Sequence, residues 1–256
     1  MPSLKTKNFF SEDEKMKIIE KIAKRNADNH AHPIPKIVAF GDSNTQGCFE
    51  VFESDDGKID VVYDSKNAYH AILSRLLGEL FPRAAVTVVN AGISGDSTEG
   101  ALKRLERDVL SEKPDLVIVS FGSNDCAVHG LDYADTYAEN LKKIFLSIKK
   151  TGSEIIFLTA PMGCRSVHYQ VKGENLRKIA ADVANVQNKG VKNLYFERGK
   201  EAAKECGAMI CDVQAKWNRL AELGVDTDAL LSNHINHPTR EMTHMTARML
   251  LDTMLI

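Results

Sequence analysis

The stretch KIVAFGDS, residues Lys36–Ser43, runs from an apolar segment straight into a glycine, an aspartate and a serine. A short apolar run bounded by turn residues is typical of a strand buried on both faces of a parallel sheet. Ser43 would then lie just beyond the carboxyl end of that strand, at the edge where open parallel sheets bind their ligands. The stretch therefore predicts an α/β fold with a candidate nucleophile at its ligand-binding edge.

Four further apolar runs predict the rest of the sheet. They lie at residues 86–89, 115–120, 154–159 and 208–211, and they alternate with helical patterns at 68–80, 99–110, 133–150 and about 173–206. Strands that alternate with helices form crossover connections, and these build a parallel sheet whose two faces are covered by helices. We therefore predict five parallel strands between helices.

Two segments lie outside this alternation. Residues 11–26 predict an amphipathic helix, with Ser11 and Glu14 at capping-box spacing, so we assign residues 1–35 to an N-terminal helical extension and 36–256 to one domain. The apolar face of this helix must pack somewhere, and a homo-oligomer contact is one expectation. Residues 50–63 predict a hairpin that begins seven residues after Ser43. The hairpin either overhangs the site or lies on the surface without a role at the site.

Composition excludes several classes of protein. The chain of 256 residues has 33 lysines and arginines against 35 acidic residues, so its net charge of −2 gives no reason to expect nucleic acid as a partner. No apolar run approaches the ~18 residues that a membrane span requires. The first residues lack an apolar signal core, and we expect a cytoplasmic protein. Five cysteines are an odd number without regular spacing, and we expect free thiols.

Three polar blocks complete the parts of an acyl-transfer site. They are NAGISGD at residues 90–96, GSND at 122–125 and NHP at 236–238. A serine hydroxyl needs a base, which His237 supplies, and the oxyanion that forms on attack needs fixed donors. The backbone N–H groups of Ser43 and Gly95 and the side-chain amide of Asn124 provide three. Since the first two blocks also follow predicted strands, we expect them to converge on Ser43.

These four blocks resemble those of the SGNH-type (GDSL-like) hydrolases over roughly residues 36–250. The resemblance implies a three-layer α/β/α sandwich of flavodoxin-like type. It implies that Ser43 is the nucleophile, that Gly95 and Asn124 form the oxyanion hole, and that His237 is the base. The family hydrolyses carboxylic esters and uses neither a metal nor an organic cofactor.

The chain departs from the family pattern at the third member of the catalytic triad. The family carries an aspartate three residues before the histidine, where this sequence has His234. A one-residue insertion would move the position to Asn233, and Asp228 is a nearby carboxylate. Two arrangements stay open: a Ser-His dyad whose histidine is oriented by Asn233 or by a backbone carbonyl, and a triad in which Asp228 folds back. An asparagine can accept from Nδ1–H but cannot stabilise imidazolium by charge.

The function expected from this site is hydrolysis of a small-molecule ester through an acyl-enzyme. Small or medium acyl groups, including O-acetyl groups on carbohydrate, are the expected substrates. Acyl transfer or thioester hydrolysis at the same site, and a degenerate ester-binding protein, are the alternatives. We expect Asp42 and Asp125 to hold loops by accepting N–H groups. His234, His237 and His244 have no cysteine or carboxylate at a suitable spacing, so we expect no metal site.

Overall fold

Five parallel strands form the central sheet, in the order β4-β1-β5-β6-β7. The computed structural model describes residues 16–256. The strands are β1 (Lys36–Gly41), β4 (Thr87–Gly92), β5 (Leu116–Ser120), β6 (Glu154–Leu158) and β7 (Met209–Cys211). This order is that of the flavodoxin-like sheets, in which connections from the two neighbouring central strands leave in opposite directions. The predicted fold is confirmed, and its ligand-binding crevice is expected where β1 and β5 end.

Alternation along the strands divides the core into two layers. On β1, Ile37 and Ala39 pack into one cluster of buried side chains, whereas Val38 and Phe40 pack into the other. Successive side chains of a strand point to opposite faces, so a strand covered on both faces is apolar throughout. This explains why the sheet reads in the sequence as continuous apolar runs.

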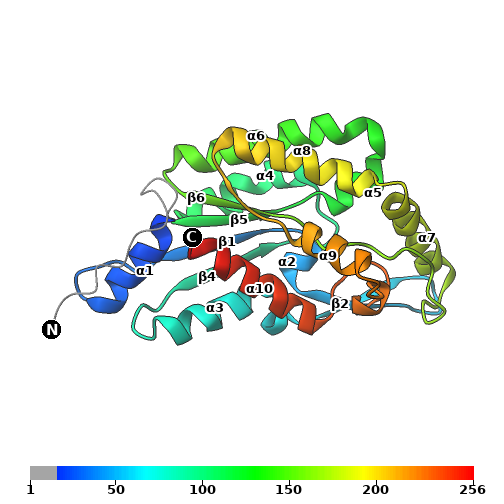
Figure 1. The fold of residues 1–256 in the computed structure, drawn as a ribbon, viewed down its shortest axis with the longest axis horizontal. Coiled ribbons are helices and arrows are strands. Elements are labelled where there is room, and N and C mark those ends of the chain that lie inside the picture. The colour runs from blue at the N-terminus through cyan, green and yellow to red at the C-terminus, as the bar shows by residue number, and fades with distance from the viewer. Residues whose placement is uncertain (1–15) are drawn as a thin grey trace.

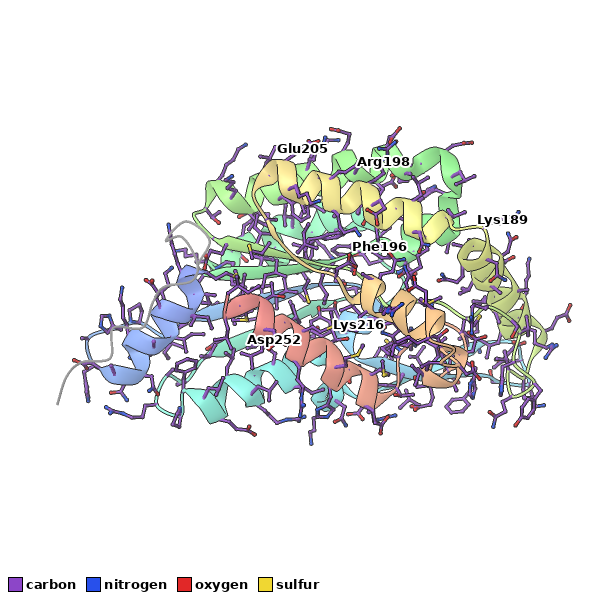
Figure 2. All side chains as sticks on the ribbon, in the orientation of Figure 1. Lys189, Phe196, Arg198, Glu205, Lys216 and Asp252 are labelled. Atoms are coloured by element: carbon purple, nitrogen blue, oxygen red, sulfur yellow. The ribbon has the colours of Figure 1, made fainter. Side chains whose placement is uncertain are left out.

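Helices cover both faces of the sheet (Figure 1). On one face lie α1 (Lys17–Ala27), α3 (Tyr69–Leu80), α9 (Val213–Glu222) and α10 (Arg240–Met254). On the other lie α4 (Thr98–Asp108), α6 (Ala134–Lys150) and α8 (Val191–Cys206). Figure 2 shows how α8 divides: Phe196 is buried toward the sheet, whereas Glu205 lies on the exposed side. Within residues 16–256, no helix is both long and apolar enough to cross a membrane.

The sequence patterns did not predict three of the helices, α2, α5 and α7, as separate elements. The pattern at 173–206 is two helices, α7 (Glu174–Asn188) and α8, because the chain turns at Gly190 with a φ of +70°. That left-handed conformation suits glycine and ends the helical run. The short α2 (Ser43–Gln46) and α5 (Ser123–His129) follow β1 and β5 directly. Both therefore begin at the carboxyl edge of the sheet, inside the polar blocks.

The N-terminal helix α1 packs on its own chain. Its buried side chains include Ile18 and Ile22, and the N–H groups of Lys17 and Ile18 donate to the carboxylate of Glu154 at 2.8 and 2.6 Å. The predicted capping pair, Ser11 and Glu14, lies outside the described residues. Since this apolar face is covered, the fold does not require a partner there, and an oligomer through this helix stays a prediction.

The predicted hairpin is present as β2 (Cys48–Glu53) and β3 (Ile59–Tyr63), paired antiparallel. Its far end is fastened to the start of α7: Leu176 N–H donates to Glu53 Oε2 at 2.9 Å, and Asn175 Nδ2 donates to the Gly57 carbonyl at 3.1 Å. In Figure 1, β2 lies on the same side of the molecule as α2 and α7. The hairpin thus borders the carboxyl edge of the sheet.

Candidate active site

Ser43 is the first residue of α2 and is almost fully buried, with 6% of its surface exposed. The turn that presents it is held by Asp42, whose Oδ1 accepts the Asn44 N–H at 3.0 Å. The Ser43 N–H has no hydrogen-bond partner within residues 16–256. It is therefore free to donate to a ligand beside the hydroxyl.

His237 contacts Ser43 directly. Its Nε2 lies 3.0 Å from Ser43 Oγ, and its Nδ1 lies 2.9 Å from the backbone carbonyl oxygen of Phe49 on β2. A carbonyl oxygen can only accept a hydrogen bond, so Nδ1 must carry the proton and Nε2 presents its lone pair to the serine hydroxyl. This is the tautomer that a general base requires.

The surroundings of His237 keep its imidazole neutral. Burial lowers its pKa below the ordinary value for histidine, while the hydrogen bond to Phe49 and the charge of Glu50 act in the opposite direction. Desolvation disfavours the charged form of a base, and it is the largest effect here. At neutral pH the ring is therefore in the form that can take a proton.

Neither side chain expected to orient His237 occupies that position. Asn233 Oδ1 accepts the N–H groups of three residues that follow it, at 2.9 to 3.0 Å: Ile235, Asn236 and His237. It shapes the loop and does not contact the ring. Asp228 instead accepts the Arg165 N–H at 3.0 and 3.1 Å. The backbone carbonyl, the other alternative left open by the sequence, takes the place of both, because β2 runs beside His237.

His234, at the family's usual aspartate position, also points elsewhere. Its ring stacks on that of His168 at 4.1 Å between centroids, and its backbone is left-handed with a φ of +54°. Within the described part of the chain, no three histidine, cysteine or acidic side chains gather closely enough to hold a metal ion. His234 therefore packs against His168, on the segment after β6, and not against His237.

The two expected oxyanion donors are joined to each other and to the nucleophile helix. Asn124 Nδ2 donates one hydrogen to the Asp96 carbonyl at 2.8 Å, which leaves its second amide hydrogen available. Gly95 has a φ of +79°, and its N–H has no partner within residues 16–256. Gln46 Oε1 on α2 accepts the adjoining Ser94 N–H at 2.7 Å. The blocks at residues 90–96 and 122–125 thus converge on the helix of Ser43, as predicted.

Two buried acids hold these loops. Burial raises the pKa of Asp42 to about 6, although the Asn44 N–H acts against the shift. Burial also raises the pKa of Asp125, whose Oδ1 accepts both the N–H and the hydroxyl of Thr98 at the start of α4. Asp42 thus holds its own turn, and Asp125 ties the start of α5 to the start of α4, which are the structural roles that the sequence predicted.

No pattern in the sequence points to Phe49, because the group it contributes to the site is a backbone carbonyl. A cavity of about 310 Å³ lies beside this segment, between β2, the residues before α7 and the loop that precedes His237. Its walls include Glu50, Glu53, Lys172 and Asn233. Ser43 and His237 do not line it.

All five cysteines are buried and free, and none replaces Ser43 beside the imidazole.

Comparison with known proteins identifies the family of the chain. Residues 39–244 match the GDSL-like Lipase/Acylhydrolase family. The chain belongs to this family. An acetylxylan esterase of Geobacillus stearothermophilus is 25% identical over 193 residues, 72% of this chain and 78% of that protein. An arylesterase of Vibrio mimicus is 30% identical over 118 residues, 43% of this chain and 58% of the relative. Together these findings identify a serine ester hydrolase.

Solved structures give the same assignment. A mutant of Axe2, an acetyl-xylooligosaccharide esterase from Geobacillus, superposes with a TM-score of 0.62 and 25% identity, covering 87% of this chain and 94% of that one. Catalytic mutants of Axe2 carry alanine in place of a serine, an aspartate or a histidine, with the aspartate three positions before the histidine. The present chain has His234 three positions before His237, so it carries no aspartate at that spacing.

Proposed function

We propose that this protein hydrolyses short-chain carboxylic esters, with O-acetyl groups on carbohydrate as the preferred class, through an acyl-enzyme on Ser43. The observation that carries the proposal is the pair of contacts made by His237. Its Nε2 lies 3.0 Å from Ser43 Oγ while its Nδ1–H donates to the Phe49 carbonyl. A serine next to an imidazole in this tautomer is an activated nucleophile.

The first half of the reaction forms the acyl-enzyme. His237 Nε2 takes the hydroxyl proton of Ser43 as Oγ attacks the carbonyl carbon of the ester. The resulting oxyanion accepts from the N–H groups of Ser43 and Gly95 and from the Asn124 amide, and each such donor is worth ~3 kcal/mol in the transition state. The imidazolium then gives its proton to the departing alkoxide, so that the alcohol leaves and the acyl group stays on Oγ.

The second half repeats these steps with water. His237 takes a proton from the water as its oxygen attacks the acyl carbon, and the same donors hold the second oxyanion. Collapse returns the proton to Ser43 Oγ and releases the carboxylic acid. The cycle ends with serine and neutral imidazole restored.

Two observations favour a small acyl group. The acetylxylan esterase relative aligns over 72% of this chain, and the nucleophile is 94% buried, which limits the space around its hydroxyl. We expect hydrolysis of p-nitrophenyl acetate to exceed that of the octanoate by at least about tenfold in kcat/KM, since binding differences of a few methylenes reach this size. Acetate release from acetylated xylose tests the carbohydrate part of the proposal.

Serine labelling tests the mechanism. A fluorophosphonate should label Ser43, and Ser43→Ala and His237→Ala should each remove most turnover. The double variant should be little worse than either, because nucleophile and base act as a unit. Ser111→Ala, on the exposed surface, is the matched control and should label and turn over like the parent. A chain that neither labels nor hydrolyses any of these esters would instead be an ester-binding protein.

A further inference from the structure

Three charged side chains lie directly behind the carbonyl that His237 binds. The guanidinium of Arg240 donates from Nη1 and Nη2 to the two carboxylate oxygens of Glu50, at 2.7 and 3.2 Å, and from Nε to Asp64 Oδ2 at 2.8 Å. Paired N–H groups that meet both oxygens of one carboxylate fix its direction as well as its distance. We call Arg240, Glu50 and Asp64 the Arg240 clamp.

The clamp holds the residue that orients the base. The Arg240 guanidinium lies 4.3 Å from the centre of the Phe49 ring, and Glu50 is the next residue of β2. Asp64 is fixed in turn, since its N–H donates to the Gly47 carbonyl at 2.8 Å. Arg240 begins α10 only three residues after His237. One guanidinium therefore joins the segment that carries the imidazole to the segment that carries its hydrogen-bond acceptor.

The clamp also carries an unbalanced charge. It contains two carboxylates and one guanidinium, so its formal charge is −1. The charge of Glu50 raises the pKa of His237 against the larger effect of burial. Two further titratable residues adjoin the catalytic pair along the chain: His234 lies three residues before His237, and Asp42 directly precedes Ser43. The imidazole is buried, so it feels a nearby charge more than a surface group would, although solvent partly screens the half-buried Glu50 and Arg240 side chains.

We propose that the Arg240 clamp replaces the missing triad acid in two ways. It holds the Phe49 carbonyl in place at Nδ1 of His237. It also places net negative charge beside the imidazolium that forms when His237 takes the Ser43 proton. The inference rests on the proposed roles of Ser43 and His237. Glu50 and Arg240 are positioning residues, because their side chains hydrogen-bond to each other and not to Ser43 or the His237 ring. A neutral carbonyl fixes the tautomer, and the clamp supplies the charge that a carbonyl lacks.

Two substitutions separate the charge from the geometry. Glu50→Gln keeps an acceptor for Arg240 but removes the negative charge. It should lower kcat about tenfold with KM within about twofold, since the imidazolium exists only after proton transfer. The acid limb of its kcat/KM profile should move to lower pH. Arg240→Gln should also lower kcat, because the carbonyl is loosened, but it leaves two uncompensated carboxylates and should move the acid limb to higher pH.

Asp60→Asn is the matched control, since it removes an exposed carboxylate from β3 of the same hairpin. It should leave both kcat and the pH profile unchanged. If Arg240→Gln does not fold, Asp64→Asn takes its place and should move the acid limb in the same direction as Glu50→Gln, by less. If the clamp is only structural, its variants should lose activity without any shift of the pH profile of kcat/KM.

Titration of the His237 ring by NMR in the full chain supplies a readout that needs no substrate. The pKa of His237 should fall in Glu50→Gln, rise in Arg240→Gln and stay unchanged in Asp60→Asn. Equal titration of the parent and Glu50→Gln would overturn the proposal, as would shifts of the same sign in Glu50→Gln and Arg240→Gln. If the parent protein hydrolyses no ester but the variants show the expected shifts in the His237 pKa, the proposed function is wrong and the proposed role of the clamp still holds.

Discussion

At Nδ1 of His237 a backbone carbonyl stands where a triad would place a carboxylate, and the two differ in charge more than in geometry. Converting the acid of a Ser-His-Asp triad into its amide costs ~10⁴ in kcat, because the amide allows the wrong tautomer. The Phe49 carbonyl has no hydrogen to donate, so the wrong tautomer gains nothing from it. The proposed Ser-His dyad would therefore avoid the main penalty that follows loss of the acid.

Asn124 is expected to act on kcat. Asn124→Ala should lower kcat by about 10²–10³ with little change in KM, because its free amide hydrogen binds a charge that exists only in the transition state. Steady-state kinetics on p-nitrophenyl acetate measure both constants, and circular dichroism checks that losing the bond to the Asp96 carbonyl has not unfolded the loop. A rise in KM alone would make Asn124 a substrate-binding residue.

Asn233 and Asp228 should behave differently when each is changed to alanine. Asn233→Ala leaves three N–H groups of the His237 loop without their acceptor, so it should cost about 1–3 kcal/mol of unfolding free energy and reduce turnover. Asp228→Ala should leave kcat within about fivefold of the parent, since its carboxylate contacts Arg165 and not the ring. A large loss of kcat in Asp228→Ala with the fold intact would instead favour a triad with Asp228 as its third member.

At the scale of elements, local signals were sufficient for the sheet but not for the contact that completes the site. Each strand shows its burial in its own apolar run, and Ser43, Gly95 and Asn124 follow strands whose ends meet. The contact between Phe49 and His237 joins residues 188 positions apart, and its acceptor is a backbone atom. Only the docking of the hairpin onto α7 and α10 creates it, and no local pattern encodes that docking.

Gly92 tests how closely β4 must approach the helix that carries Ser43, and Gly78 serves as its control. A Cβ at Gly92 would lie 2.2 Å from the backbone nitrogen of Gln46, so Gly92→Ala must push β4 away from α2. We expect a loss of at least about 1–3 kcal/mol in unfolding free energy and a large loss of activity. Gly78→Ala is the control: its Cβ meets nothing within 4 Å, and it lies inside α3. It should stabilise the protein by about 0.5–1 kcal/mol, by denaturant titration.

At the scale of the whole molecule, the fold keeps charged groups buried beneath its reactive edge. Lys192 on α8 is 5% exposed, and its Nζ donates to the Pro161 carbonyl at 2.6 Å after β6. Burial lowers its pKa, as it raises the pKa of Asp42 beside the nucleophile. Charges removed from water oppose folding unless they are fully paired. The segments that present Ser43 therefore reduce the stability that the apolar layers provide.

Asp42→Asn should reveal this cost as a pH-dependent gain in stability. The folded-state pKa of Asp42 is about 6, above its ordinary 3.8, so the folded protein binds this proton more tightly than the unfolded chain. Its contribution is present below about pH 4 and is lost as the pH rises through 6, where the buried carboxylate becomes charged. Two pKa units correspond to about 3 kcal/mol.

The unfolding free energy of Asp42→Asn relative to the parent should therefore be greater at pH 8 than at pH 4 by up to about 3 kcal/mol, since asparagine does not ionise but can still accept the Asn44 N–H. Urea titrations at both pH values measure it. Asp60→Asn, on the exposed face of the hairpin, should change stability by less than about 0.5 kcal/mol at either pH. A relative gain that shrinks as pH rises would mean that Lys192 and the Asn44 N–H together favour the charged carboxylate in the folded protein.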